Sequence, residues 1–140
     1  MATNDVVVRL AKVPMFSGCS KKELTAIART VREIDHPAGT VIATEGEPGA
    51  GLFVIETGEA EVTIGGKRVN RLKKGEFFGE MALLDGGPRT ATVTATTDIQ
   101  MWALTEWVFR GLLVEHPTIA LRTLEAMASR LRNATKTASA

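Results

Sequence analysis

Two charged side chains of opposite sign stand in a mostly small or apolar, glycine-rich run, GEFFGEMALLDGGPRTATVTA, residues 75–95. Charged groups are seldom buried without a partner. The planar guanidinium of Arg89 is suited to phosphate, and the carboxylate of Glu80 can accept hydrogen bonds from hydroxyl groups. The pair therefore predicts a ligand that carries an anion and a diol close together, as a ribose phosphate does.

Strand geometry supports this expectation. In an extended chain successive side chains point to opposite faces. Over 89–95 one face would carry Arg89, Ala91, Val93 and Ala95, and the other Thr90, Thr92 and Thr94. The apolar face should line the interior, which places the guanidinium beside small alanines in a cavity. Because an unpaired buried charge costs several kcal/mol, that cavity is expected to hold an anion.

Backbone groups between the two charges can add to such a site. Gly79, Gly86 and Gly87 permit positive φ and a close approach of ligand to main chain. A short helical turn over 81–85 would leave its first N–H groups unpaired and partly positive, which favours an anion. Glu80 would lie at the mouth of that turn.

The residues before and after this run predict a β-barrel with helices on both sides. Ser20 and Glu23 form an S-x-x-E capping box, and apolar residues at helical spacing follow, which predicts an N-terminal helix over about 20–35. These residues are Leu24, Ile27, Ala28 and Val31. Over 36–104 the period changes to two, with β-branched residues and frequent glycines. We therefore predict an antiparallel jelly-roll barrel of about eight short strands.

Helical spacing returns over 105–133, where two C-terminal helices are predicted. Thr105 is the expected N-cap of the first, and Pro117 starts the second. The second helix has apolar residues stepping by three, four and three, as in a short coiled-coil seam, although packing on the barrel explains them equally well. They are Leu121, Leu124, Ala128 and Leu131. Residues 134–140 are expected to form a frayed tail. The fold class is α+β, in a single domain over 1–140.

Composition narrows the classes of function. The 17 Lys and Arg and 16 Asp and Glu leave a net charge of +1, which is no electrostatic footprint for nucleic acid. The single cysteine, Cys19, fits a reducing compartment. No run approaches the ~20 apolar residues of a membrane helix, so a cytoplasmic chain without a membrane segment is expected. His36 and His116 lack the spacing of a metal site, and common catalytic motifs are absent.

The run FGEMALLDGGPRTATV resembles the phosphate-binding cassette of cyclic nucleotide-binding domains, whose pattern is F-G-E-(L/M)-A-L, a few variable residues, then P-R-(S/T/A)-A. The similarity covers roughly residues 12–133, through PAGTVIATEGEPGAGLFVIETGEAEV and EHPTIALRTLEAMASRLR. It implies the family's β-roll with the cassette at 77–92. It also implies a cyclic nucleotide as ligand, cAMP first and cGMP second, with no further cofactor and no metal.

The resemblance implies a role for each matching position. Glu80 would bind the ribose 2′-hydroxyl, and Arg89 would bind the exocyclic oxygens of the cyclic phosphate. Gly79 would contact the sugar, while the backbone N–H groups of Ala82 and Ala91 would help to hold the phosphate. The other expected ligand contacts are Phe78, Met81, Thr90 and Arg130.

Several of these roles have alternatives. Thr90 would touch the phosphate or the guanine amino group, or only cap the strand. Arg130, with Arg132 as second choice, would pack on the purine as part of a helical lid, or remain a solvated charge. Glu80 and Arg89 could form a structural ion pair in an empty barrel. Some family members sense other ligands, but they tend to lose the Glu–Arg pair or add cysteines.

Two classes of function follow. In the first, the chain is a stand-alone cyclic nucleotide sensor whose C-terminal helix closes over the base and signals to a protein partner. The opening Met1 favours an intact small protein or an N-terminal piece over the tail of a channel. In the second, it is the sensor half of a transcription regulator of the catabolite activator type or of a nucleotide-gated channel. The chain itself is expected to bind no nucleic acid and to catalyse no reaction. A homodimer through the last helix is a further alternative.

Overall fold

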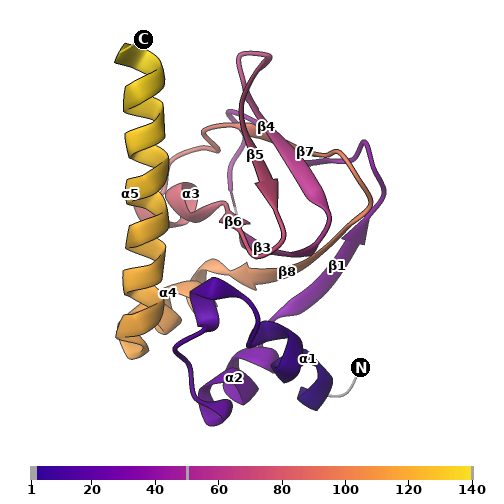
Figure 1. Ribbon diagram of the computed structural model, residues 1–140, viewed down its shortest axis with the longest axis vertical. Coiled ribbons are helices and arrows are strands. Elements are labelled where there is room, and N and C mark those ends of the chain that lie inside the picture. The colour runs from indigo at the N-terminus through magenta and orange to yellow at the C-terminus, as the bar shows by residue number, and fades with distance from the viewer. Residues whose placement is uncertain (1–2, 50, 140) are drawn as a thin grey trace.

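The computed structural model describes residues 3–49 and 51–139 as two antiparallel sheets with helices on one side (Figure 1). The elements are α1 (Thr3–Leu10), the 3-10 turn η1 (Pro14–Phe16), α2 (Lys21–Ala28), β1 (Arg32–His36), β2 (Val41–Ala43), β3 (Gly51–Thr57), β4 (Glu59–Ile64), β5 (Lys67–Lys73), β6 (Phe77–Phe78), α3 (Glu80–Asp85), β7 (Thr92–Ala95), β8 (Ile99–Thr105), α4 (Glu106–Glu115) and α5 (Pro117–Ser139). The predicted fold class, a roll of about eight short strands with N-terminal and C-terminal helices, is confirmed.

The roll consists of two four-stranded sheets, ordered β1-β8-β3-β6 and β2-β7-β4-β5. Strand β8 is buried on both of its faces. Ile99 and Met101 belong to the core inside the roll, whereas Trp102 and Leu104 belong to a second core under the helices. Since adjacent residues of a strand point to opposite faces, β8 joins the two cores and fixes the helices against the roll.

The predicted N-terminal helix over 20–35 is too long. The capping box is present, with Glu23 N donating to Ser20 Oγ at 3.1 Å and Ser20 N donating to Glu23 Oε1 at 2.8 Å. However, α2 ends at Ala28, and residues 32–36 form β1, which pairs with β8. The roll therefore begins at residue 32 and not at 36. Residues 32–36 form a strand because they pair with β8, which is distant in the sequence. The spacing of nearby apolar residues does not contain that information.

Helix α1 was not predicted, and it is held to the sheet by Arg9. The guanidinium donates to both carboxylate oxygens of Glu56 at 2.9 Å and also contacts Glu33, while its Nε lies 3.2 Å from Asp5. It lies 5.7 Å from the ring centroid of Trp102. Charges from α1, β1 and β3 thus meet over the central tryptophan of β8.

The two C-terminal helices begin where the sequence predicts. Thr105 Oγ1 accepts a hydrogen bond from Val108 N at 3.3 Å at the start of α4, and α5 begins at Pro117. His116, at the joint between the two helices, contacts the carboxylate of Glu23 on α2. Residues 134–139, for which a frayed tail is predicted, continue α5 as helix.

Helix α5 stands as a column along one side of the roll, beside α3 and α4 (Figure 1). It is buried at Ile119 and Thr123. The seam residues lie exposed, at 56% for Leu121, 62% for Leu124 and 69% for Leu131. Packing on the barrel therefore does not explain the seam. Among the described residues, no helix combines the length and the apolar character that a membrane span requires.

The capping carboxylate of α2 gives a testable pH dependence. The hydrogen bond from the Ser20 N–H, followed by the contacts with the Ser20 hydroxyl and with His116, lowers the pKa of Glu23 below its ordinary value of 4.5. A depressed acid contributes stability above its ordinary pKa and loses it as the pH falls through the folded-state value. The difference in unfolding free energy between the wild type and Glu23→Gln should therefore shrink on acidification below about pH 4.5.

Urea unfolding of both proteins at neutral and at acidic pH would measure this difference. If the difference in unfolding free energy between the two proteins keeps its size throughout the acid range, the lowered pKa of Glu23 is contradicted.

Candidate functional site

The turn between β6 and α3 accepts only glycine. Gly79 has φ 99°, the left-handed region. A Cβ there would lie 2.5 Å from Arg89 Nη1 and 2.6 Å from the carbonyl oxygen of Gly51. As the N-cap of α3, Gly79 also provides no side-chain acceptor for the first N–H groups of this helix. The turn thus places the side chain of Arg89 against the backbone of Gly79. It also leaves the first N–H groups of α3 without an acceptor from the N-cap side chain.

Arg89 is held by backbone carbonyls and not by an acid. Its Nη2 donates to the carbonyl of Gly51 at 3.0 Å, and its Nη1 lies 3.4 Å from the carbonyl of Gly79. The guanidinium lies 5.8 Å from the ring centroid of Phe53. Burial lowers the pKa of Arg89, and the negative charge of Glu80 acts in the opposite direction. Among the described residues no carboxylate forms an ion pair with Arg89.

Glu80 is buried, with 4% of its surface exposed, and is paired with a residue from the last helix. Its Oε1 accepts from Arg130 Nη1 at 2.8 Å. Arg130 also donates to the carbonyl of Phe77 and lies 4.8 Å from the ring centroid of that residue. The Glu80–Arg89 ion pair considered from the sequence is therefore not formed. Arg130 is likewise not the solvated charge of the second alternative.

The other end of α3 is held by α4. Arg110 Nη2 donates to the carbonyl oxygens of Leu83 at 2.7 Å and Leu84 at 3.3 Å, and its Nε donates to Glu106 at 3.1 Å. These carbonyls belong to the last turn of α3, where a helix lacks internal donors. The cassette helix is thus contacted at its start by Arg130 of α5 and at its end by Arg110 of α4.

The remaining predicted residues surround this centre. Phe78 is buried and stacks on Phe53, with ring centroids 5.2 Å apart. Ala82 is buried in α3, and Ala91 is half-buried before β7. Met81 and Thr90 are exposed. Strand β7 begins at Thr92, so the extended segment predicted from residue 89 starts three residues later.

The residues that sequence reasoning missed are Gly51, Phe53 and Arg110. Gly51 is the last residue of the glycine-marked stretch GEPGAG, and Phe53 follows two residues later, so the spacing of these glycines was a usable signal for a close backbone approach. Nothing in the spacing of α4 distinguishes Arg110 from an ordinary surface arginine, because its acceptors are backbone carbonyls of a distant segment.

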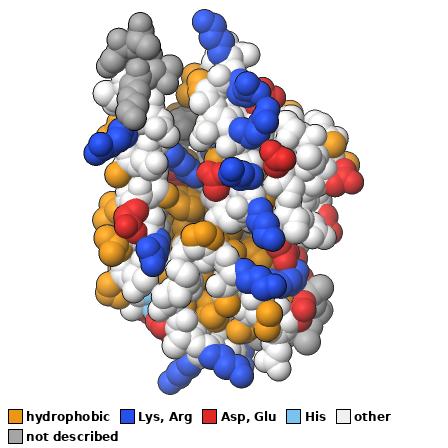
Figure 2. All heavy atoms as spheres, in the orientation of Figure 1, with side chains coloured by type: hydrophobic (Ala, Val, Ile, Leu, Met, Phe, Trp, Pro, Cys, Tyr) orange, Lys and Arg blue, Asp and Glu red, His pale blue; other side chains and the backbone are white. Residues whose placement is uncertain are grey.

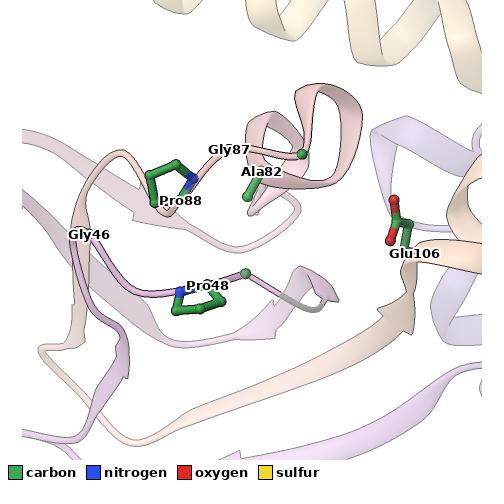
Figure 3. Close-up of a pocket in the computed structure, with 8 residues that line it drawn as sticks. Gly46, Pro48, Ala82, Gly87, Pro88 and Glu106 are labelled. Carbon is green, nitrogen blue, oxygen red and sulfur yellow. The ribbon is translucent and has the colours of Figure 1, made fainter.

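A hollow of about 290 Å³ opens beside α3 (Figure 3). Its walls are Gly46, Pro48, Gly49, Ala82, Gly86, Gly87, Pro88 and Glu106. Of these eight, Glu106 is the ionisable one, and it is paired with Arg110. An acidic wall does not favour an anion, so Arg89 is better suited to a phosphate than this hollow is. In the part of the chain that the structure describes, no cluster of three or more His, Cys, Asp and Glu could hold a metal.

The crowding at Gly79 gives a prediction with a matched control. Gly79→Ala should destabilise the fold by about 2–4 kcal/mol, because it adds a steric clash to the strain of positive φ. Gly86→Ala, at the other end of α3, has φ 73° but open space around its Cβ. It should cost only about 1 kcal/mol. Chemical denaturation of both variants would test this, and equal losses would contradict the crowding argument.

Comparison with known proteins agrees with the geometry. A family model described as the cyclic nucleotide-binding domain matches residues 33–116. The cAMP-dependent protein kinase regulatory subunit of Pyricularia oryzae is 39% identical over 116 residues, which cover 81% of this chain and 30% of that protein. The chain spans between 22% and 30% of the length of eight curated relatives that it matches.

Solved structures show the same fold. The cAMP-bound PfPKA-R structure has a TM-score of 0.82 at 27% identity, and the match covers 95% of this chain and 47% of that one. The catabolite activator protein of Thermus thermophilus has a TM-score of 0.78 at 29% identity, over 90% of this chain and 62% of that one. On its cassette, its fold and the match of the family model, the chain belongs to the cyclic nucleotide-binding domain family.

Proposed function

We propose that this chain binds cAMP and acts as a regulatory sensor, not as a catalyst. The observation that carries the proposal is Arg89, a half-buried guanidinium that touches two backbone carbonyls and pairs with no carboxylate in the described residues. A cation in this position is stabilised by an anionic ligand. The curated relatives are regulatory subunits named for cAMP, which favours cAMP over cGMP.

The phosphate would lie between Arg89 and the start of α3. The fork of the guanidinium offers paired donors to two oxygens of one phosphate. The N–H groups of Ala82 and Ala91 would add neutral donors, as the resemblance implies. The N-cap Gly79 brings no side chain that would compete for the helical N–H groups. The site thus combines one full charge with backbone dipoles, which suits the single charge of a cyclic phosphate.

Glu80 would hold the ribose and at the same time connect it to α5. A carboxylate has two oxygens, and Arg130 contacts Oε1. A ribose 2′-hydroxyl could donate to the same carboxylate without displacing Arg130. We propose that the nucleotide thereby strengthens the contact between the cassette and α5, so that occupancy of the site stabilises the docked helix.

The response would be passed to a protein partner through α4 and α5. Both helices contact the cassette directly, α4 through Arg110 and α5 through Arg130. A ligand can shift such a contact only by its differential affinity for the two arrangements, typically ~1–3 kcal/mol. That is enough to change the population of a docked helix that a partner recognises.

Loss of the phosphate contact is the direct test. Arg89→Ala should weaken cAMP binding by about 2–4 kcal/mol, the range expected for a charge-assisted contact. Arg132→Ala, which removes an exposed arginine from α5, is the matched control and should bind as the wild type does. Calorimetric titration with cAMP and with cGMP would give both affinities and the preference. Unchanged affinity in Arg89→Ala would remove the phosphate assignment.

The connection to α5 makes a separate prediction. Addition of cAMP should slow amide exchange over residues 117–133 more than in the strands, because Glu80 would hold ligand and Arg130 together. The slowing should be lost in Arg130→Met and kept in Arg132→Met. If cAMP leaves the amide exchange rates over residues 117–133 of the wild type unchanged, α5 does not respond to the nucleotide, whether or not cAMP binds.

A further inference from the structure

The side chain of Arg89 lies against a loop that is distant in the sequence, the segment that joins β2 to β3. Figure 2 shows how Lys and Arg side chains project from one face of the molecule. Arg89 is instead half-buried, and its guanidinium lies on backbone carbonyls. Because a long arginine side chain has many rotamers, this single placement requires neighbours that exclude the others.

The backbone of Arg89 is hydrogen-bonded in both directions to this loop. Arg89 N donates to the carbonyl of Glu47 at 2.8 Å, and Gly46 N donates to the carbonyl of Arg89 at 2.9 Å. Pro48 and Pro88 form an antiparallel bridge next to these bonds (Figure 3). The first atoms of the arginine side chain are therefore fixed relative to the loop.

Gly49, the next residue of the loop, lies against the stem of the same side chain. A Cβ at this position would lie 2.8 Å from Arg89 Nε and 3.0 Å from Arg89 Cδ, and 2.7 Å from the Cβ of Ala82 in α3. Atoms in ordinary van der Waals contact are about 3.5–4.0 Å apart. Position 49 therefore has no room for a side chain while Arg89 keeps its place.

The need for glycine at this position is steric and not conformational. Gly49 does not have a positive φ, in contrast to Gly46 and Gly79. An alanine at position 49 thus avoids the strain of the left-handed region, and one of its neighbours must move instead. Ala82 Cβ is attached directly to the backbone of α3, whereas the arginine can rotate about its own side-chain bonds. An added methyl group should therefore displace Arg89 first.

We propose that Gly49 is a positioning residue of the site, because its missing side chain leaves room for the guanidinium of Arg89 on the carbonyls of Gly51 and Gly79. In this place Arg89 Nη2 donates to Gly51 at 3.0 Å, and Nη1 lies 3.4 Å from the carbonyl of Gly79. The effect of Gly49 on ligand binding rests on the proposed function, whereas its contact with Arg89 does not.

A double-mutant cycle with Arg89 tests the proposal. Gly49→Ala should weaken cAMP binding by about tenfold, the scale of one charge-assisted hydrogen bond, because the guanidinium is displaced. In the Arg89→Ala background the same change should alter the affinity by less than about twofold, since no guanidinium remains to be displaced. Calorimetric titration with cAMP measures every member of the cycle. The matched control is Gly111→Ala, which adds a methyl group in open space on α4 and should bind as the wild type does.

The contact itself is tested without nucleotide. Gly49→Ala should lower the urea midpoint of unfolding, because crowding drives Arg89 from its carbonyl partners. It should lower the midpoint less in the Arg89→Ala background, where those hydrogen bonds are already absent. If Gly49→Ala alone does not fold, recovery of a folded protein in the double variant would show the same coupling. Circular dichroism reports whether each variant is folded.

The outcomes separate this inference from the function on which it rests. If Arg89→Ala weakens cAMP binding while Gly49→Ala does not, or if the two losses add, Gly49 does not position Arg89 and the proposed function stands. If Arg89→Ala leaves the affinity unchanged, the proposed function is wrong and the urea midpoints decide. Coupled midpoints support the placement of Arg89 by Gly49. Additive midpoints, or a double variant that remains as unfolded as Gly49→Ala, would overturn it.

Discussion

The side chain of Glu80 is buried where β6 turns into α3, and a buried carboxyl group needs a hydrogen-bond donor. In this structure the donor is Arg130, which comes from α5, 50 residues further along the chain. The position of the last helix is thus set by an acid of the site and not by apolar packing alone. A buried acid of this kind makes the site and the helix parts of one arrangement.

The cassette helix is short, and its environment compensates for this. Six residues form less than two turns, which are unstable by themselves. Arg110 satisfies carbonyls at its end, and Arg130 pairs with the acid at its start. Arg89 is held differently, by the carbonyls of Gly51 and Gly79. Of these three arginines, Arg89 is the one without a carboxylate partner among the described residues.

The sequence predicts well where the signal is local. The capping box of α2, the Thr105 cap, the proline start of α5 and the turn after Gly79 are set by nearby residues, and each is present. The partners of Glu80 and of Arg110 are distant in sequence, so neither contact could be predicted. The same holds for the end of α2, which pairing of β1 with β8 decides. Even the seam of α5 could be recognised as apolar, while its exposure depends on which side of the helix meets the roll.

The two faces of α5 also bear on how this sequence can diverge. Ile119, Thr123 and Arg130 face the fold and the site, so substitutions there would alter folding and the environment of Glu80 together. Leu121, Leu124 and Leu131 are each more than half exposed, so their replacement should disturb the cassette less. A lineage could therefore gain, lose or exchange surface partners by drift on one side of a single helix, while its ligand chemistry stays under separate selection on the other.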